Sequence, residues 1–295
     1  MRRRFATLDV FARRRFGGNP LAVVLDGEEL EATEMQSIAR EFNLGETVFV
    51  LPAQNPNHRA RLRIFTPAAE LRFLGLPLVG TAVLLDKVDG GNDQAVLELE
   101  IGPIQCATRT LDDTRGWASF QLPRLAEEVG ETASHDAIAA ALGLSPREIG
   151  FDRLKPSRWS AGTPYTFVPV GGLEAIRRCS TSPIHWNAAF GQDGAAYIFS
   201  RETVEAASSF HARMFAPRHG IIEDPATGSA VSAFSGAYAC IAEPGDGEHE
   251  LSIEQGYEMG RPSLIGLSVK FRNGQLMSAA ISGEAIIVTE GTIET

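Results

Sequence analysis

Short runs of apolar residues, several of them alternating with polar ones, dominate the first hundred positions and predict β-strands. Gly, Pro, Asn or Asp, which favour turns, bound most of these runs. The predicted strands are residues 5–10, 21–25, 47–51, 61–65 and 96–101. A chain with many short strands and few helical segments is typical of an α+β protein.

Helical periodicity is clear in only a few segments. Residues 33–42 place their apolar side chains on one helix face, and Thr33 with Gln36 predicts a capping box at the start, with Gly45 just beyond the end. A second helix is predicted over residues 135–142. The segment 123–134, which contains several acidic residues, is predicted to cross from one lobe to another.

An internal repeat is the most informative pattern. The motif Arg-x-Phe-x-Pro occurs at residues 63–67 and again at 213–217, and Gly-Thr/Ser-Ala follows each copy, at 80–82 and 228–230. Both offsets are close to half the chain. Two motifs that recur in the same order at nearly the same offset predict two duplicated lobes.

An apolar run follows each copy of the repeat, at residues 78–85 and 230–241, and is predicted to be helical. Pro77 and Pro225 stand near the first helical turn, where proline is tolerated. A helix N-terminus carries free N–H groups and a partial positive charge. Each lobe is therefore expected to present a helix N-terminus that attracts a carboxylate or an enolate.

Composition and charge narrow the class of protein. The chain has 295 residues, 44% of them apolar, and a net charge of −10, so nucleic acid and anionic membranes are not expected partners. Three widely spaced cysteines, Cys106, Cys179 and Cys240, suit a reducing compartment, and Cys106 and Cys240 are expected in the core. No signal peptide and no membrane span are recognised. We predict a cytoplasmic protein.

Glu46 and Asp224 are the candidate chemical groups. Asp224 precedes Pro225 and a run of small residues, so it is either a helix N-cap or a site residue beside free backbone donors. Glu46 opens a strand after Gly45 and is either a solvated loop residue or a general acid or base. Both alternatives remain open at this point.

Residues 75–81 have the glycine spacing of a phosphate loop but lack its lysine, so a nucleoside triphosphate site is not predicted. The six histidines form neither H-x-x-x-H nor H-E-x-x-H, so zinc is not predicted either. We expect no metal and no cofactor.

The chain resembles the phenazine-biosynthesis PhzF-like family, whose fold is that of diaminopimelate epimerase. The resemblance extends from residue 9 to residue 263, and the sequence Glu-Asp-Pro-Ala-Thr-Gly-Ser-Ala is its most specific part. The matching blocks are 9–11, 16–20, 38–47, 65–67, 70–82, 223–230 and 255–263.

The resemblance implies an α+β fold of two pseudo-symmetric lobes, each a bent antiparallel-rich sheet or barrel around a central helix. It also implies that the last strand, near residues 285–289, returns to the first lobe. The lobes are then 1–124 plus 283–295, and 125–282. An active site between the lobes and a homodimer are further implications.

By position in the family, Glu46 is implied as the catalytic glutamate and Asp224 as the active-site aspartate. Gly228 and Ser229 are implied to hold the substrate's carboxylate, and Gly75 and Leu76 to lie in the substrate-binding loop. The family usually has Gly-His-Pro where this chain has Gly-Leu-Pro at 75–77. This departure makes the family's reference reaction, isomerisation of trans-2,3-dihydro-3-hydroxyanthranilate, less expected than its fold.

The function that follows is a cofactor-independent isomerase that moves a proton within a small carboxylate-bearing metabolite. Two alternatives remain. An amino-acid racemase or epimerase would share the fold, but it normally needs a thiol in each lobe, and neither loop has one. A binding protein that has lost the chemistry is the other alternative, and Leu76 is the residue that suggests it.

Overall fold

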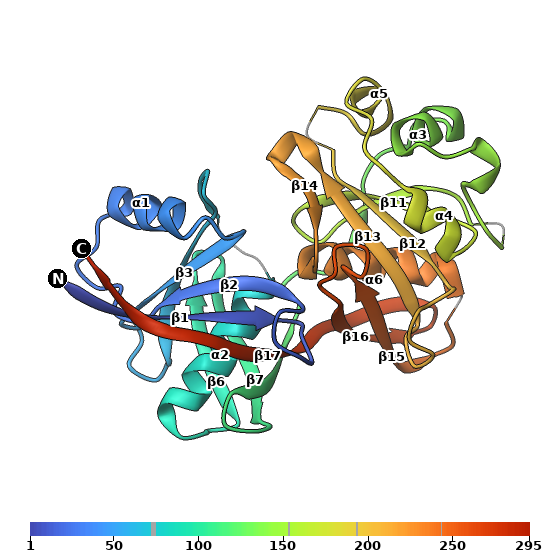
Figure 1. Cartoon of the computed structure of the whole chain (residues 1–295). Coiled ribbons are helices and arrows are strands. Elements are labelled where there is room, and N and C mark those ends of the chain that lie inside the picture. The colour runs from blue at the N-terminus through green and yellow to red at the C-terminus, as the bar shows by residue number, and fades with distance from the viewer. Residues whose placement is uncertain (72–74, 153, 193, 243) are drawn as a thin grey trace. The chain divides into compact units, whose positions relative to one another are not determined.

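Two compact units make up the computed structural model, which describes residues 1–71, 75–152, 154–192, 194–242 and 244–295 (Figure 1). Unit 1 comprises Met1–Pro123 together with Ser282–Thr295, and unit 2 comprises Arg124–Ile281. No helix formed by these described residues is long and apolar enough to cross a membrane.

The elements of unit 1 are, in chain order, β1 (Arg2–Val10), β2 (Asn19–Val24), α1 (Ala32–Phe42), β3 (Glu46–Leu51), β4 (Ala60–Phe65), β5 (Glu70–Leu71), α2 (Gly75–Asp89), β6 (Gln94–Leu99), β7 (Gly102–Thr110) and β8 (Arg115–Gln121). Those of unit 2 are β9 (Glu127–Glu128), α3 (His135–Leu142), η1 (Pro146–Glu148), β10 (Ser157–Ser160), β11 (Pro164–Pro169), α4 (Leu173–Arg178), α5 (Trp186–Phe190), β12 (Ala196–Ser200), β13 (Phe210–Ala216), η2 (Pro217–His219), β14 (Ile221–Asp224), α6 (Gly228–Ala242), β15 (Gly247–Gln255) and β16 (Ser263–Arg272). Strand β17 (Gln275–Glu294) begins in unit 2 and continues into unit 1.

The strands of unit 1 form a closed barrel. They pair in the order β1, β2, β3, β4, β6, β7, β8 and β17, and β17 pairs with β1 to close the ring. The return of β17 along β1 was expected near residues 285–289, and Ala285 lies opposite Val10 while Thr289 lies opposite Thr7 (Figure 1). A closed ring leaves no strand edge unpaired.

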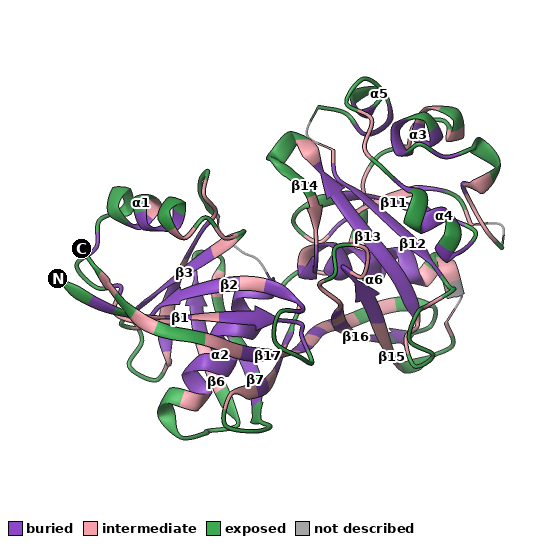
Figure 2. Cartoon of the chain, viewed as in Figure 1, coloured by how far each residue is buried: buried purple, intermediate pink, exposed green. Residues whose placement is uncertain are grey.

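Helix α2 fills this barrel. Every residue from Gly75 to Asp86 is buried, and the helix packs against strands on several sides (Figure 2). A helix that is buried on all sides is apolar on all sides, which explains why this segment lacks amphipathic periodicity. It also begins three residues earlier than the predicted run, so Pro77 lies within its first turn, where proline is tolerated.

Gly80 is a packing residue within α2. A Cβ at this position would lie 2.5 Å from Leu21 Cδ2 and 2.7 Å from Val10 Cγ2, so only glycine allows the helix to approach β1 and β2 this closely. The Gly-Thr-Ala sequence at 80–82 is therefore not a helix start, and its match to 228–230 was misleading. The true counterpart of Gly228 is Gly75, because each begins its helix five residues after a glutamate, Glu70 or Glu223.

Unit 2 has a sheet that pairs in the order β9, β10, β11, β12, β13, β15 and β16, with β14 added to β13. Helix α6 packs against β9, β10, β11 and β16. A separate core around Trp186 lies beneath α3, α4 and α5. Cys240, expected in the core, is exposed near the end of α6, whereas Cys106 is buried as predicted.

The duplicated lobes that the sequence predicts are confirmed by the strand pairing. In both units a hairpin, a parallel pair, an antiparallel pair and a second parallel pair follow one another before a final antiparallel pair. The registers also match. Arg61 pairs with Glu98 across β4 and β6, and His211 pairs with Glu254 across β13 and β15.

The Arg-x-Phe-x-Pro motif has the same contacts in both units. Arg63 donates two hydrogen bonds to Glu70, of 2.6 and 2.7 Å, and its guanidinium lies over the Phe65 ring. Arg213 donates two to Glu223, of 2.7 and 2.8 Å, and lies over Phe215. The arginine therefore holds in place the short strand that leads to α2 or α6, because a bidentate pair fixes both the distance and the relative orientation of the two side chains.

Helix α1 begins with a different capping box from the predicted one. Glu31 and Glu34 satisfy each other's backbone N–H groups, while Gln36 donates its side-chain N–H groups to the carbonyls of Thr66 and Pro67. Gln36 therefore forms hydrogen bonds with a loop that is distant in sequence instead of capping the helix. The helix ends at Asn43, which adopts a left-handed conformation with φ of 50°.

Candidate functional site

Three of the sequence-predicted residues, Asp224, Gly228 and Ser229, lie together at the start of α6 in unit 2. Asp224 ends β14, and Gly228 and Ser229 are the first two residues of the helix. Thr227 occupies the N-cap position, and its carbonyl accepts the first helical hydrogen bond, from Val231. Asp224 is therefore not the N-cap, and the first of its two interpretations was wrong.

The turn between Asp224 and α6 is held by a network of short hydrogen bonds. The Thr227 hydroxyl donates to Asp224 Oδ2 at 2.6 Å. The fully buried Gln255 side chain donates to the Asp224 carbonyl at 2.7 Å and to Thr227 Oγ1 at 2.9 Å, and accepts from the Thr227 N–H. These bonds fix the backbone around Asp224 before any ligand binds. Sequence analysis assigned no role to Gln255, although it begins one of the matching blocks.

Two tyrosines that sequence reasoning did not single out adjoin this network. Tyr165 Oη lies 2.7 Å from Ser229 Oγ. Tyr197 is completely buried, and its hydroxyl has no hydrogen-bond partner among the described residues. Burial raises the pKa of Tyr197 far above its ordinary value, and the negative charge of Asp224 adds to the effect. Both residues stand in apolar strands, where a tyrosine gives no sequence signal beyond that of a core residue.

The strand registers and helix starts give each of these polar residues a counterpart in unit 1, and every counterpart is aliphatic. Tyr165, Tyr197, Asp224, Ser229 and Gln255 correspond to Leu21, Val48, Leu71, Leu76 and Leu99, respectively. At these described positions, unit 2 therefore carries hydrogen-bonding groups around its helix start and unit 1 carries aliphatic ones. The two units therefore share their strand pairing and helix starts but differ in the chemistry of the side chains at these positions.

At the position of Glu46 the difference is the opposite one, because unit 1 has the polar residue and unit 2 the apolar one. It is the first residue of β3, and its counterpart in unit 2 is Ala195. One carboxylate oxygen, Oε2, is shielded from solvent, although the residue as a whole is partly exposed. Glu46 is thus a strand residue with half of its carboxylate buried, rather than a solvated loop residue.

Gly75 and Leu76, the remaining predicted residues, begin α2, and both are buried. Leu76 is 3% exposed. Helix α2 also packs against β3, the strand that carries Glu46. Unit 1 therefore combines an apolar helix start with one carboxylate.

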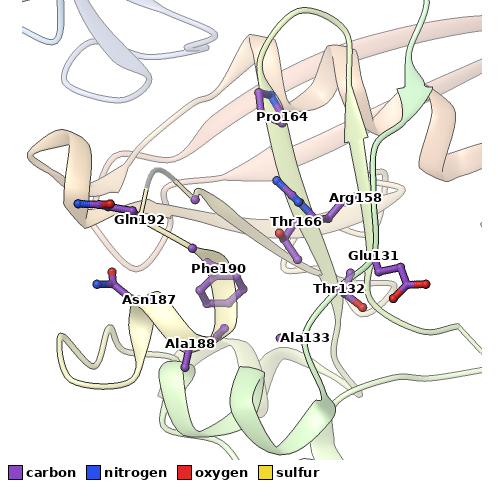
Figure 3. A pocket seen from close by; sticks show the side chains of 13 residues that line it. Glu131, Thr132, Ala133, Arg158, Pro164, Thr166, Asn187, Ala188, Phe190 and Gln192 are labelled. Atoms are coloured by element: carbon purple, nitrogen blue, oxygen red, sulfur yellow. The ribbon is translucent and has the colours of Figure 1, made fainter.

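A pocket of about 540 Å³ opens elsewhere on unit 2 and is lined largely by α5, β10, β11 and the segment before α3 (Figure 3). Arg158 and Thr166, which pair across β10 and β11, both line it. Tyr165 is next to Thr166, and successive side chains of a strand point to opposite faces. The pocket therefore lies on the face of β11 opposite to Ser229, and it is not part of the candidate site.

A buried ionic cluster supports the loop that follows Gln255. His211 is inaccessible to solvent, with Nδ1 2.7 Å from Glu254 and Nε2 3.0 Å from Glu258. Burial acts to lower the pKa of His211, but its hydrogen bonds to the two carboxylates outweigh this and raise it. Burial likewise acts to raise the pKa of Glu254 and Glu258, and the bonds with His211 lower both. The cluster favours a charged imidazolium between two carboxylates.

This cluster predicts a pH dependence of stability. A histidine with a raised pKa in the folded state stabilises fully below its unfolded pKa of about 6.5, and the stabilisation is lost as pH rises through the folded pKa. Replacing His211 by Gln is therefore expected to reduce the fall in unfolding free energy between pH 6 and pH 9, measured by urea denaturation. Replacing the exposed His185 by Gln is the control and should leave the profile unchanged. Parallel profiles for wild type and the His211 variant would contradict the assignment.

Clusters of three or more His, Cys, Asp or Glu arranged to hold a metal ion are not found among the residues that the structure describes. The groups at the start of α6 are hydroxyls, an amide, backbone N–H groups and one carboxylate. Backbone N–H groups at a helix N-terminus favour an anionic group, and the hydroxyls and the amide can form hydrogen bonds.

Known proteins share both the sequence and the fold. The family model described as "Phenazine biosynthesis-like protein" matches residues 8–291. An uncharacterized isomerase of Mesorhizobium japonicum is 46% identical, covering 99% of this chain and 98% of that protein. The trans-2,3-dihydro-3-hydroxyanthranilate isomerase of Pseudomonas chlororaphis is 33% identical, covering 98% of both. The crystal structure of a PhzF-family phenazine biosynthesis protein from Bacillus anthracis covers the whole of both chains with a TM-score of 0.90 at 24% identity, and it confirms the predicted fold class.

Proposed function

The chain belongs to the phenazine biosynthesis-like family, and we propose that this isomerase moves a proton within a small carboxylate-bearing metabolite without the help of a cofactor. The observation that carries the proposal is the chemical asymmetry between the two duplicated units. Hydrogen-bonding groups gather at the start of α6, whereas the corresponding part of unit 1 is aliphatic and contributes one carboxylate, Glu46.

The start of α6 is the proposed site for the substrate's carboxylate. The backbone N–H groups of Gly228 and Ser229 are among those that have no partner within the helix, and the helix dipole places a partial positive charge there. The Ser229 hydroxyl adds a donor. Groups that are fixed in advance stabilise developing negative charge by a few kcal/mol each, because they need not reorganise during the reaction.

Glu46 is the proposed acid and base. It removes a proton from one carbon of the bound substrate and returns it at another, so that the reaction is redox-neutral and needs no co-reactant. The Oε2 atom of its carboxylate is shielded from solvent, whereas the residue as a whole is partly exposed. Asp224, held by Thr227 and Gln255, is proposed to orient an amine or hydroxyl of the substrate.

The racemase alternative gains no support from the cysteines. Cys106 lies on β7, Cys179 follows α4, and Cys240 lies near the C-terminal end of α6. None of them stands at the first residues of α2 or α6. The binding-protein alternative is favoured by one observation, the buried Leu76, because leucine neither accepts nor donates a proton.

The proposal is tested by incubating wild type and the variant Leu76→His with trans-2,3-dihydro-3-hydroxyanthranilate in D₂O after treatment with EDTA. We expect the variant to turn this compound over at least tenfold faster than wild type and to place solvent deuterium on carbon, measured by NMR and mass spectrometry. A histidine at this position supplies the polar group that the family usually has there. The control Leu76→Met keeps the side chain apolar at similar volume and should behave as wild type.

The same measurement on a panel of small amino and hydroxy carboxylates examines wild type itself. Deuterium incorporation into at least one of them is expected. Tight binding without any exchange would overturn the isomerase proposal and favour the binding protein. A folded Leu76→His variant without gained turnover would show that the determinants of the family reaction have diverged elsewhere in the chain.

A further inference from the structure

We propose that Tyr165 is a positioning residue. It takes no part in proton transfer, but it orients the Ser229 hydroxyl so that this group donates a hydrogen bond to the substrate's carboxylate. This inference rests on the proposed function, because it assigns a ligand to Ser229. It goes further in explaining how a flexible hydroxyl is held in one orientation before the substrate arrives.

The geometry supports one direction for the hydrogen bond between the two side chains. Tyr165 Oη and Ser229 Oγ are 2.7 Å apart, a normal O–H···O distance. Each hydroxyl can donate one hydrogen and accept another. The phenol is the more acidic of the two, so the bond in which Tyr165 donates and Ser229 accepts is favoured. The Ser229 hydrogen is then free to point at an anion.

The location of Tyr165 makes it a rigid anchor. It is 6% exposed and stands on β11, which packs against α6. Its ring lies 6.4 Å from that of Phe167, which in turn contacts Phe234 of α6. An aromatic ring held by packing on two elements costs little further entropy when it makes a hydrogen bond, so the phenol is fixed relative to the helix start.

The comparison of the two units provides an independent argument. Tyr165 and Ser229 occupy positions whose counterparts in unit 1 are Leu21 and Leu76. The pair is therefore polar in one unit and aliphatic in the other, and no mixed pair occurs. If Tyr165 served only to fill the core, leucine would suffice, as it does against α2. The phenol hydroxyl is what leucine lacks, and it lies within hydrogen-bonding distance of the Ser229 hydroxyl.

The consequence is a chain of hydrogen bonds that strengthens when a carboxylate binds. A serine hydroxyl that accepts from a phenol is a better donor, because each bond polarises the next. The carboxylate of the substrate is present before, during and after proton transfer. Tyr165 is therefore expected to affect substrate affinity more than the rate of the chemical step.

The test is a double-mutant cycle. Wild type, Tyr165→Phe, Ser229→Ala and the double variant are titrated calorimetrically with 3-hydroxyanthranilate and with benzoate, two carboxylates that cannot be isomerised by proton transfer between ring carbons without losing aromaticity. We expect Tyr165→Phe to weaken binding about tenfold. In the Ser229→Ala background the same change is expected to have no further effect. With a substrate that is turned over, KM should rise about tenfold and kcat stay within about twofold.

Tyr238→Phe is the matched control. Tyr238 lies on α6, is 9% exposed, and its hydroxyl makes no hydrogen bond to another described residue. Removing this hydroxyl should leave affinity unchanged. Unaltered binding by Tyr165→Phe, or an equal loss with and without the Ser229 hydroxyl, would overturn the positioning role while leaving the carboxylate site intact. Failure of wild type to bind either carboxylate would instead overturn the proposed function, and the inference with it.

Discussion

Replacing Glu46 by Gln is expected to lower kcat by about 10²–10⁴-fold, the range that a positioned general acid or base contributes. The glutamine side chain has the same shape but neither accepts nor returns a proton at neutral pH. The unfolding free energy should change by less than about 1 kcal/mol, because Glu46 is a partly exposed residue at the first position of β3. Deuterium exchange into substrate and urea denaturation measure the two quantities.

Glu41→Gln is the matched control for this prediction. Glu41 is exposed on α1 of the same unit, so the variant makes the same change of charge without touching the proposed site. It is expected to retain wild-type turnover. Full activity in the Glu46 variant would remove this residue from the mechanism and leave Asp224 as the remaining carboxylate of the proposed site.

Replacing Arg213 by Met should cause the largest loss of stability, about 3–5 kcal/mol, because it breaks a buried ion pair and leaves one charge without compensation. The Arg213 side chain is 8% exposed and its partner Glu223 14%. Its guanidinium also donates to the carbonyls of Ile176 and Cys179, at 2.9 and 2.8 Å, at the C-terminal end of α4. The Cys179 carbonyl would lose this donor away from water, whereas the Ile176 carbonyl still accepts from the Cys179 N–H.

Arg63→Met is the control, because the duplication places the same bidentate pair in unit 1 at a more exposed position. The Arg63 and Glu70 side chains are 27% and 39% exposed, so water compensates for the lost partner and about 1 kcal/mol or less is expected. Chemical denaturation followed by tryptophan fluorescence compares the two variants. Equal losses would show that burial does not decide the energetic weight of this motif.

Arg213 also supports the candidate site at the start of α6. Glu223 immediately precedes Asp224, and Arg213 holds both of its carboxylate oxygens. The motif that the sequence repeats is therefore the support of the segment that leads into α6. This explains why a motif without an obvious catalytic group recurs in both halves.

Much of the architecture could be predicted from the sequence. The five predicted strands match β1, β2, β3, β4 and β6, and the helices over 33–42 and 135–142 match α1 and α3. Short strands bounded by turn residues and a helix with one apolar face are local patterns, which depend on neighbours along the chain. The repeated arginine motif correctly predicted the duplication for a related reason, because the two residues of each ion pair lie close in sequence.

The failures share a different cause. Thr33 and Gln36 satisfy the pattern of a capping box, but Gln36 is taken by the distant carbonyls of Thr66 and Pro67. The helical run was predicted to begin at residue 78, but α2 begins at Gly75, and Gly80 lies inside it where the helix approaches β1 and β2. Cys240 lies in an apolar run and yet faces outward near the end of α6. In each case the outcome depends on a contact that no local pattern contains.

The sequence predicted an α+β duplication, and together with the family resemblance it singled out Glu46, Asp224, Gly228 and Ser229 as candidate site residues. The predicted elements and the duplication rest on periodicity, turn residues and motif spacing, which are properties of short segments, whereas the roles of the candidate residues rest on the resemblance. Only the tertiary structure decided which half is polar. Strand registers bring Tyr165, Tyr197 and Gln255 around the start of α6 and set leucine or valine at the same places in unit 1, because pairing between distant strands, and not the residues beside them, chooses each side chain's neighbours.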